Sequence, residues 1–80
     1  MTAMSDEATA KKGVLKQLAR QGGAMHIKDL HEFSTLRFGR GHREFSELME
    51  ALVAEELVTY DAGSFALTDA GKKATGSMLL

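Results

Sequence analysis

The 80-residue chain contains no cysteine, no proline and no tryptophan. The absence of cysteine excludes disulfides, cysteine-based zinc sites and thiol nucleophiles, and it suits a reducing cytoplasm. No eighteen consecutive residues are apolar, and residues 1–10 contain two acids and no apolar run, so neither a membrane span nor a secretory signal is predicted. We therefore expect a soluble, cytoplasmic protein with no membrane contact.

Sequence motifs of catalysis are missing as well. There is no Gly-x-Ser-x-Gly element and no phosphate-binding loop, since Gly39-Arg40-Gly41 alone is too short to form one. The spacings of His26, His31 and His42 match no metal-binding motif. A domain of this length has little room for a concave active site, so we expect no catalytic residues, no metal and no cofactor. A hydrolase or metalloenzyme is a third hypothesis, which tight stoichiometric zinc uptake would support.

The residues that are present form the composition of an ordinary globular domain with an uneven distribution of charge. Apolar residues make up 44% of the chain and charged residues 26%, and eighty residues suffice for one small core. The formal net charge of −1 hides two basic segments, residues 1–20 and 21–43, each of which sums to +2. Residues 44–61 contain six acids and no base, and residues 62–80 sum to +1. A basic first half is thus followed by an acidic stretch.

Helical periodicity occurs in three places. A favourable start at Ser5, an apolar stripe and a stop at Gly22-Gly23 predict a first helix over residues 6–20. Residues 27–34 predict a second helix of about two turns, preceded by a short strand at residues 24–26. Residues 35–43 contain two glycines and are predicted to be a flexible, basic connection. The third helix is the clearest, and its predicted buried face holds Phe45, Leu48, Met49, Leu52 and Val53.

The last third of the chain predicts a hairpin and a short helix. Residues 57–60 and 65–68 have the pattern of two strands around a glycine-containing turn. Thr68 can cap a final helix that Gly71 weakens and Gly76 ends. We therefore expect an α+β domain over residues 6–75, with a disordered N-terminus at residues 1–5 and an apolar C-terminal tail at residues 76–80.

Two segments carry a family resemblance. Residues 48–60, LMEALVAEELVTY, resemble the end of the recognition helix and the first wing strand of the winged helix-turn-helix superfamily. Residues 63–72, GSFALTDAGK, resemble the second wing strand and the Leu-Thr-x-x-Gly signature of many bacterial transcription regulators. The resemblance implies a three-helix winged helix-turn-helix with a C-terminal β-hairpin wing and a short final helix. It also implies a DNA-binding transcriptional regulator or accessory DNA binder, of bacterial or phage type.

The resemblance further implies where double-stranded DNA would be contacted. In DNA-binding members the third helix enters the major groove, and flanking positive residues hold phosphates. In this sequence those places fall on Arg37, Arg40, His42, Arg43 and Ser46. Further backbone contacts are expected from Lys72 and Lys73. Lys11, Lys12, Lys16 and Arg20 of the first helix are another source, for which a solvated helix face is the simpler interpretation.

Acidic residues on the third helix favour a different function. Helical geometry points Glu47 and Glu50 outward, where they would repel phosphate, and the turn at residues 61–64 has no basic residue. The alternative is therefore a winged-helix protein–protein interaction module (adaptor). Its acidic face would bind a basic protein partner through Glu47, Glu50, Glu55 and Glu56. For either function we expect a monomer or a weak homodimer formed through the first helix or the C-terminal tail.

Overall fold

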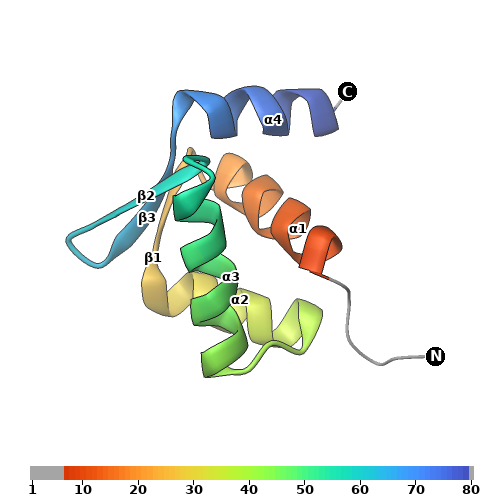
Figure 1. Ribbon diagram of the computed structural model, residues 1–80, viewed down its shortest axis with the longest axis vertical. Helices are drawn as coiled ribbons and strands as arrows, with labels where there is room; N and C mark the ends of the chain where they lie inside the picture. The colour runs from red at the N-terminus through yellow and green to blue at the C-terminus, as the bar shows by residue number, and fades with distance from the viewer. Residues whose placement is uncertain (1–6, 80) are drawn as a thin grey trace.

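The computed structural model describes the backbone of residues 7–79 and the side chains of residues 7–76. Within this range four helices and three strands follow one another in the order α1 (Glu7–Arg20), β1 (Ala24–His26), α2 (Ile27–Phe38), α3 (His42–Ala54), β2 (Val58–Asp61), β3 (Ser64–Leu67) and α4 (Asp69–Leu79). Helices α4 and α2 lie at opposite ends, with α1 between them (Figure 1). The predicted α+β class is confirmed. The predicted disordered residues 1–5, including the helix start at Ser5, lie outside the described residues.

The three strands form one antiparallel sheet in the order β1-β3-β2. Ala62 and Gly63 both have positive φ in the two-residue turn between β2 and β3, which matches the twist of a tight hairpin. The Gly63 carbonyl also accepts a hydrogen bond from the Ile27 backbone N–H at 2.8 Å, and this joins the turn to the start of α2. The predicted hairpin and the predicted short strand at residues 24–26 are both present, the hairpin strands being displaced by one residue.

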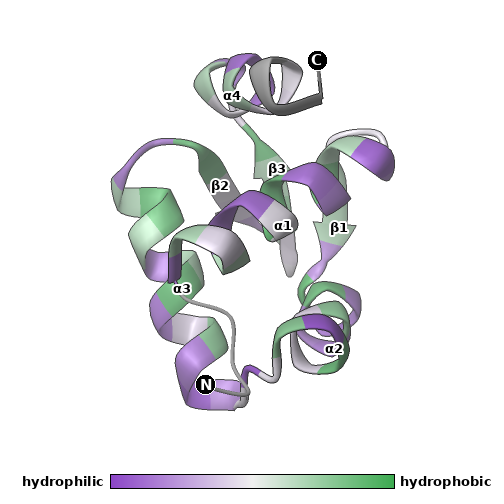
Figure 2. Cartoon of the chain, turned by 90° about the vertical axis from the view of Figure 1, so that its right-hand side faces the viewer, coloured by the Kyte–Doolittle hydropathy of each residue, from purple (hydrophilic) through white to green (hydrophobic). Residues whose placement is uncertain are grey.

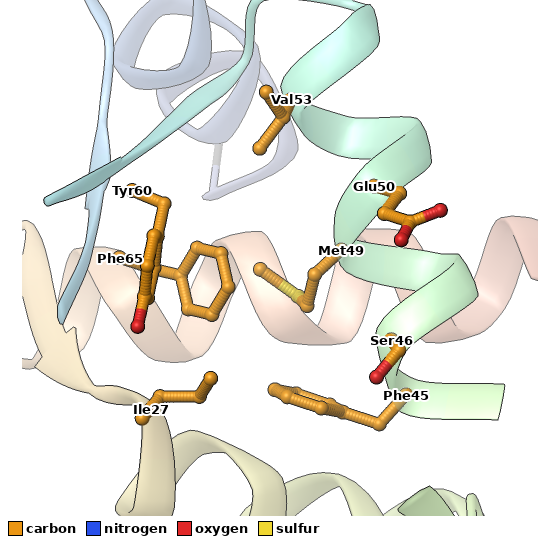
Figure 3. Close-up of a pocket in the computed structure, with 8 residues that line it drawn as sticks. All are labelled: Ile27, Phe45, Ser46, Met49, Glu50, Val53, Tyr60 and Phe65. Atoms are coloured by element: carbon orange, nitrogen blue, oxygen red, sulfur yellow. The ribbon is translucent and has the colours of Figure 1, made fainter. Parts of the chain in front are cut away.

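The core lies where α1, α2 and α3 meet one face of the sheet. Each helix contains both apolar and polar residues, as expected of an amphipathic helix (Figure 2). The buried side chains include Val14, Leu18, Leu30, Phe45, Leu48, Met49 and Leu52. Four of the five predicted core residues of α3 are therefore buried. The prediction is wrong for Val53, which is 40% exposed. Val53 points toward the hairpin, where α3 and the strands leave a groove between them (Figure 3).

Helix α2 is longer than predicted and removes the flexible connection expected from residue 35 onward. It continues to Phe38 because Ser34 and Phe38 extend the buried stripe that Leu30 begins. Phe38 packs across Gly13 of α1, where any side chain would collide with its ring. Gly39 then ends the helix in the left-handed conformation, and its N–H bonds to the carbonyls of residues 34 and 35. Residues 35–38 are thus helical and include Arg37, and Phe38 holds this last turn of α2 against α1.

Helix α4 also exceeds its prediction, because Gly76 does not end it and it runs to residue 79. The prediction of a tail that follows the helix at residues 76–80 is therefore wrong for the backbone of residues 76–79, which is helical. Residue 80 and the side chains of residues 77–80 lie outside the described part of the chain. Thr68 caps the helix as predicted, since the Gly71 N–H donates to its Oγ1 at 3.0 Å. Helix α4 packs on α1. No helix within residues 7–79 is long and apolar enough to cross a membrane.

Candidate nucleic-acid interface

Four basic side chains gather in a groove between α1 and α2. Lys12, Lys16 and Arg20 follow one another at four-residue spacing, which places them on one stripe of α1. Arg37 comes from the last turn of α2. The groove has a volume of about 270 Å³, and its other walls are Thr9, Gly13, Phe33 and Phe38. We call the surface formed by Lys12, Lys16, Arg20 and Arg37 the basic groove.

The basic groove is positive because its cations are not neutralised nearby. Among residues 7–76, none of the four forms a salt bridge. The floor is apolar, and its Phe33 and Phe38 rings meet edge to face with centroids 5.8 Å apart. Four like charges around a concave, apolar floor attract a polyanion. The solvated helix face expected for the α1 lysines is therefore one wall of a shared groove.

The turn between α2 and α3 contains a further arginine. It holds Arg40 between the C-terminal Gly39 of α2 and Gly41, the residue that begins α3. Thr35 fixes the turn by donating its hydroxyl to the Arg40 carbonyl at 2.8 Å. The Arg40 side chain is partly buried and interacts within the protein. Arg40 therefore shapes the turn more than it extends the open surface.

The first turn of α3 presents His42 and Arg43 to solvent. No side chain caps this end of the helix, because the capping residue is Gly41. Arg43 lies 3.6 Å from the Glu47 carboxylate, one turn along the same helix, and both side chains are largely exposed. Such a pair at the surface contributes little to stability and leaves Arg43 available to a partner. The start of α3 thus adds one exposed cation, Arg43.

The acidic residues of the alternative interface do not form one surface. Glu47 and Glu50 are exposed on α3. Glu55 is bound to Lys11 of α1, with 2.6 Å between Nζ and the carboxylate oxygen. The hydrogen bond to Glu55 is the largest cause that raises the pKa of Lys11 above its ordinary value of 10.5. Glu56 has positive φ in the turn before β2, and its carbonyl accepts the Thr68 hydroxyl. Only two of the four acids remain together on the exposed side of α3.

The lysines of the last helix lie on a different element from the other predicted contacts. Lys72 and Lys73 are exposed on α4, whereas Arg37 belongs to α2 at the opposite end of the molecule (Figure 1). The structure therefore brings Arg37 together with Lys12, Lys16 and Arg20 of α1, whereas His42 and Arg43 stand at the start of α3 and Lys72 and Lys73 on α4.

A second hollow, on the other side of α3, is apolar. It has a volume of about 440 Å³ and lies between α3, the hairpin and the start of α2 (Figure 3). Its walls are Ile27, Phe45, Ser46, Met49, Glu50, Val53, Tyr60 and Phe65. Ser46, predicted to reach DNA, is partly buried in this wall. We call this surface the apolar groove. The sequence pattern missed it, because Val53 and Tyr60 were expected to pack in the core and in a wing strand.

Comparison with models of known families, with curated proteins and with solved structures finds no match to this chain. Its function must be inferred from its own side chains. Two surfaces are available for that inference, namely the basic groove and the apolar groove.

The histidines serve the packing around α2. His26 caps α2, because its Nδ1 accepts the Lys28 backbone N–H at 3.1 Å. The His31 ring lies edge-on against Phe45, with centroids 4.9 Å apart, and against His42 at 5.6 Å. Among the described residues, no three histidine, aspartate or glutamate side chains converge as metal ligands would.

Proposed function

We propose that this protein is a winged helix-turn-helix that binds double-stranded DNA chiefly through its phosphates, as a transcriptional regulator or accessory DNA binder. The observation that carries the proposal is the groove in which four cations of α1 and α2 gather. Lys12, Lys16, Arg20 and Arg37 line one groove, and Arg43 follows at the next helix start. Clustered cations of this kind form the electrostatic footprint of a nucleic-acid-binding surface.

The arrangement of elements supports the winged helix-turn-helix assignment. Helices α2 and α3 follow each other after a three-residue turn, and the β2–β3 hairpin follows α3 directly. The hairpin projects from the helices beside α3, as a wing does (Figure 1). In proteins of this type α3 is the helix that approaches the major groove. His42 and Arg43 stand at its N-terminal end, from which recognition helices reach base edges.

The exposed side of α3 predicts weak sequence selectivity. Glu47 and Glu50 follow Arg43 along this side, and carboxylates repel the phosphates that border the major groove. The hairpin tip, Asp61-Ala62-Gly63, has no cation that could enter a minor groove. Base-specific hydrogen bonds would therefore be few, whereas phosphate contacts from the basic groove do not depend on sequence. We expect similar affinities for unrelated duplexes.

Fluorescence anisotropy with a labelled random-sequence duplex tests this function. Four phosphate contacts predict a slope of about −3.6 for the logarithm of affinity against that of salt concentration, or roughly a hundredfold loss between about 50 and about 200 mM salt. The double variant Lys12→Glu/Lys16→Glu should weaken binding at least tenfold and flatten this slope. Lys72→Glu/Lys73→Glu is the matched control, because it changes the net charge equally at residues outside the walls of the basic groove.

Two results would contradict the proposal. One is the absence of binding by the wild-type protein at the lowest salt concentration. The other is an equal loss of affinity in the α1 and α4 double variants, which would show that net charge matters and the basic groove does not. Circular dichroism of both variants establishes that they are folded, so that a loss of affinity can be assigned to the interface.

A further inference from the structure

The apolar groove adjoins a further hollow at Val53. This hollow has a volume of about 450 Å³ and lies between the end of α3, β2 and the start of α4. Its walls are Val53, Glu56, Val58, Thr59, Thr68, Asp69 and Ala70. We call it the α4 hollow. Val53 belongs to the walls of both and lies at one end of the apolar groove (Figure 3). Helix α3 and strand β2 therefore border two adjoining hollows.

Both hollows carry negative charge. Glu50 is in the wall of the apolar groove, and Glu56 and Asp69 are in the walls of the α4 hollow. All three residues are exposed, and within residues 7–76 none of them forms a salt bridge. No lysine, arginine or histidine belongs to either set of walls. An occupant with positive charge is therefore attracted, whereas an acidic one is repelled.

Four cations are close in sequence to these wall residues but lie outside the walls. They are Lys28, Arg43, Lys72 and Lys73. Arg43 is paired with Glu47 at 3.6 Å, and Lys28 is followed directly by Asp29. Lys72 and Lys73 come one turn after Asp69 and reduce the negative field at that end. The attraction for a cation is therefore strongest at Glu50 and Glu56.

The two hollows suit side chains of different kinds. In the apolar groove the ring of Phe65 lies 4.8 Å from that of Tyr60 and 6.2 Å from that of Phe45, measured between centroids. This aromatic lining fits one large apolar side chain, whose burial removes apolar surface from water. The α4 hollow combines Val58 and Ala70 with its two carboxylates. It fits a lysine or arginine, whose methylene groups pack on apolar surface while the charged end reaches an acid.

We propose that the two hollows bind a basic peptide segment of a partner protein, with a large apolar residue in the apolar groove and a lysine or arginine in the α4 hollow. Val53 and Tyr60 are 40% and 52% exposed on the walls, and the bound segment covers both. No wall residue belongs to the basic groove, so the interaction requires no DNA. The site differs from the acidic face predicted from the sequence, because it includes Asp69 and excludes Glu47 and Glu55.

A random peptide library displayed on phage is the probe, since it samples peptides of every charge. Selection on the wild-type protein without DNA should enrich peptides in which a leucine or an aromatic residue stands near lysine or arginine. Fluorescence anisotropy with a labelled copy of the enriched peptide then measures its affinity, which should fall as the salt concentration rises. The proposal is overturned if no peptide is enriched, or if the enriched peptides are acidic or have no large apolar residue.

A pair of charge variants locates the bound cation. Glu50→Gln/Glu56→Gln should weaken binding of the enriched peptide about tenfold, because two exposed charge pairs are lost. Asp29→Asn/Glu32→Gln is the matched control, because it changes the net charge equally at exposed residues of α2 outside both hollows. The control should bind the peptide as the wild type does.

A second pair tests the apolar contact. Val53→Ser removes apolar surface where the two hollows adjoin and should weaken peptide binding. Leu36→Ser is its control, because Leu36 is 81% exposed and belongs to neither hollow. Circular dichroism establishes that every variant is folded. Equal losses of affinity in each variant and its control would show that the peptide binds elsewhere, and would overturn the proposal.

Discussion

Two glycines inside helices mark the positions where neighbouring backbones come closest. A side chain at Gly13 would collide with the Phe38 ring, and one at Gly71 would collide with the Leu57 carbonyl. Glycine normally weakens a helix because it has no side chain to restrict its backbone. At these two positions that cost is offset by close packing of α1 on α2 and of α4 on the turn before β2. The sequence predicted only that Gly71 weakens α4, and it did not predict the role of Gly71 in packing.

Gly71→Ala should lower the free energy of unfolding by about 1–3 kcal/mol, because its Cβ would overlap a backbone carbonyl that has little freedom to move. Urea denaturation followed by circular dichroism measures this. Gly76→Ala is the control in the same helix, since no atom lies within 4 Å of the added Cβ. It should raise stability by about 0.5–1 kcal/mol through helix propensity. Equal effects of the two substitutions would show that Gly71 has no packing role.

Thr68 joins three parts of the chain through one hydroxyl. It accepts the Gly71 N–H at the start of α4 and donates to the Glu56 carbonyl before β2. Thr68→Ala should destabilise the protein by about 1–2 kcal/mol, because it removes a helix cap and a hydrogen bond at once. Thr59→Ala, at an exposed position of β2, should change the unfolding free energy by less than about 0.5 kcal/mol. A similar loss in both variants would contradict this assignment.

The helices and strands whose sequence pattern is sufficient on its own were predicted correctly. Those whose ends depend on contacts with distant residues were not. Helix α3 has an apolar face at regular spacing, and the hairpin has a glycine in a short turn, so both follow from nearest neighbours along the chain. Helix α2 was predicted too short because its buried stripe passes through the polar Ser34. Its last turn is stabilised by Phe38 against Gly13, a contact between residues 25 positions apart. Periodicity cannot reveal such a contact.

The Lys11–Glu55 ion pair joins α1 to the end of α3 and should make stability depend on pH in the alkaline range. A raised Lys11 pKa means that the folded protein holds this proton more tightly than the unfolded chain does. The stabilisation is therefore complete below pH 10.5 and is lost as the pH rises through the folded-state value. The stability difference between wild type and Lys11→Met should shrink across this range in urea denaturation. Lys12→Met, which breaks no ion pair in the described structure, should show no such trend.

At the scale of the whole molecule, α3 separates two surfaces of different chemistry. The basic groove lies between α1 and α2, and the apolar groove lies between α3 and the hairpin. The first suits a polyanion and the second, with the α4 hollow, suits a basic peptide with an apolar side chain, so the two proposals depend on different residues. Loss of DNA binding in the α1 double variant would leave peptide binding intact. Failure to bind peptides would likewise leave phosphate binding by the basic groove untouched.

The positions of the candidate DNA-binding residues were only partly predictable. Arg37, His42 and Arg43 were expected from their local concentration of charge, and all three are exposed. The sequence did not show that Arg37 shares a groove with Lys12 and Lys16, because this depends on the crossing of α1 and α2. Nor did it show that Lys72 and Lys73 stand apart, because this depends on where the hairpin directs α4.

The amino-acid sequence by itself determined the α+β class, the strongly amphipathic helix α3, the hairpin and the separation of basic from acidic segments. These features depend on residues within a few positions of one another, for which helix and strand periods suffice. Only the tertiary structure decided the full lengths of α2 and α4, the exposure of Val53, the pairing of Glu55 with Lys11 and the two grooves. Each depends on side chains that are distant in the chain and meet only when the helices pack.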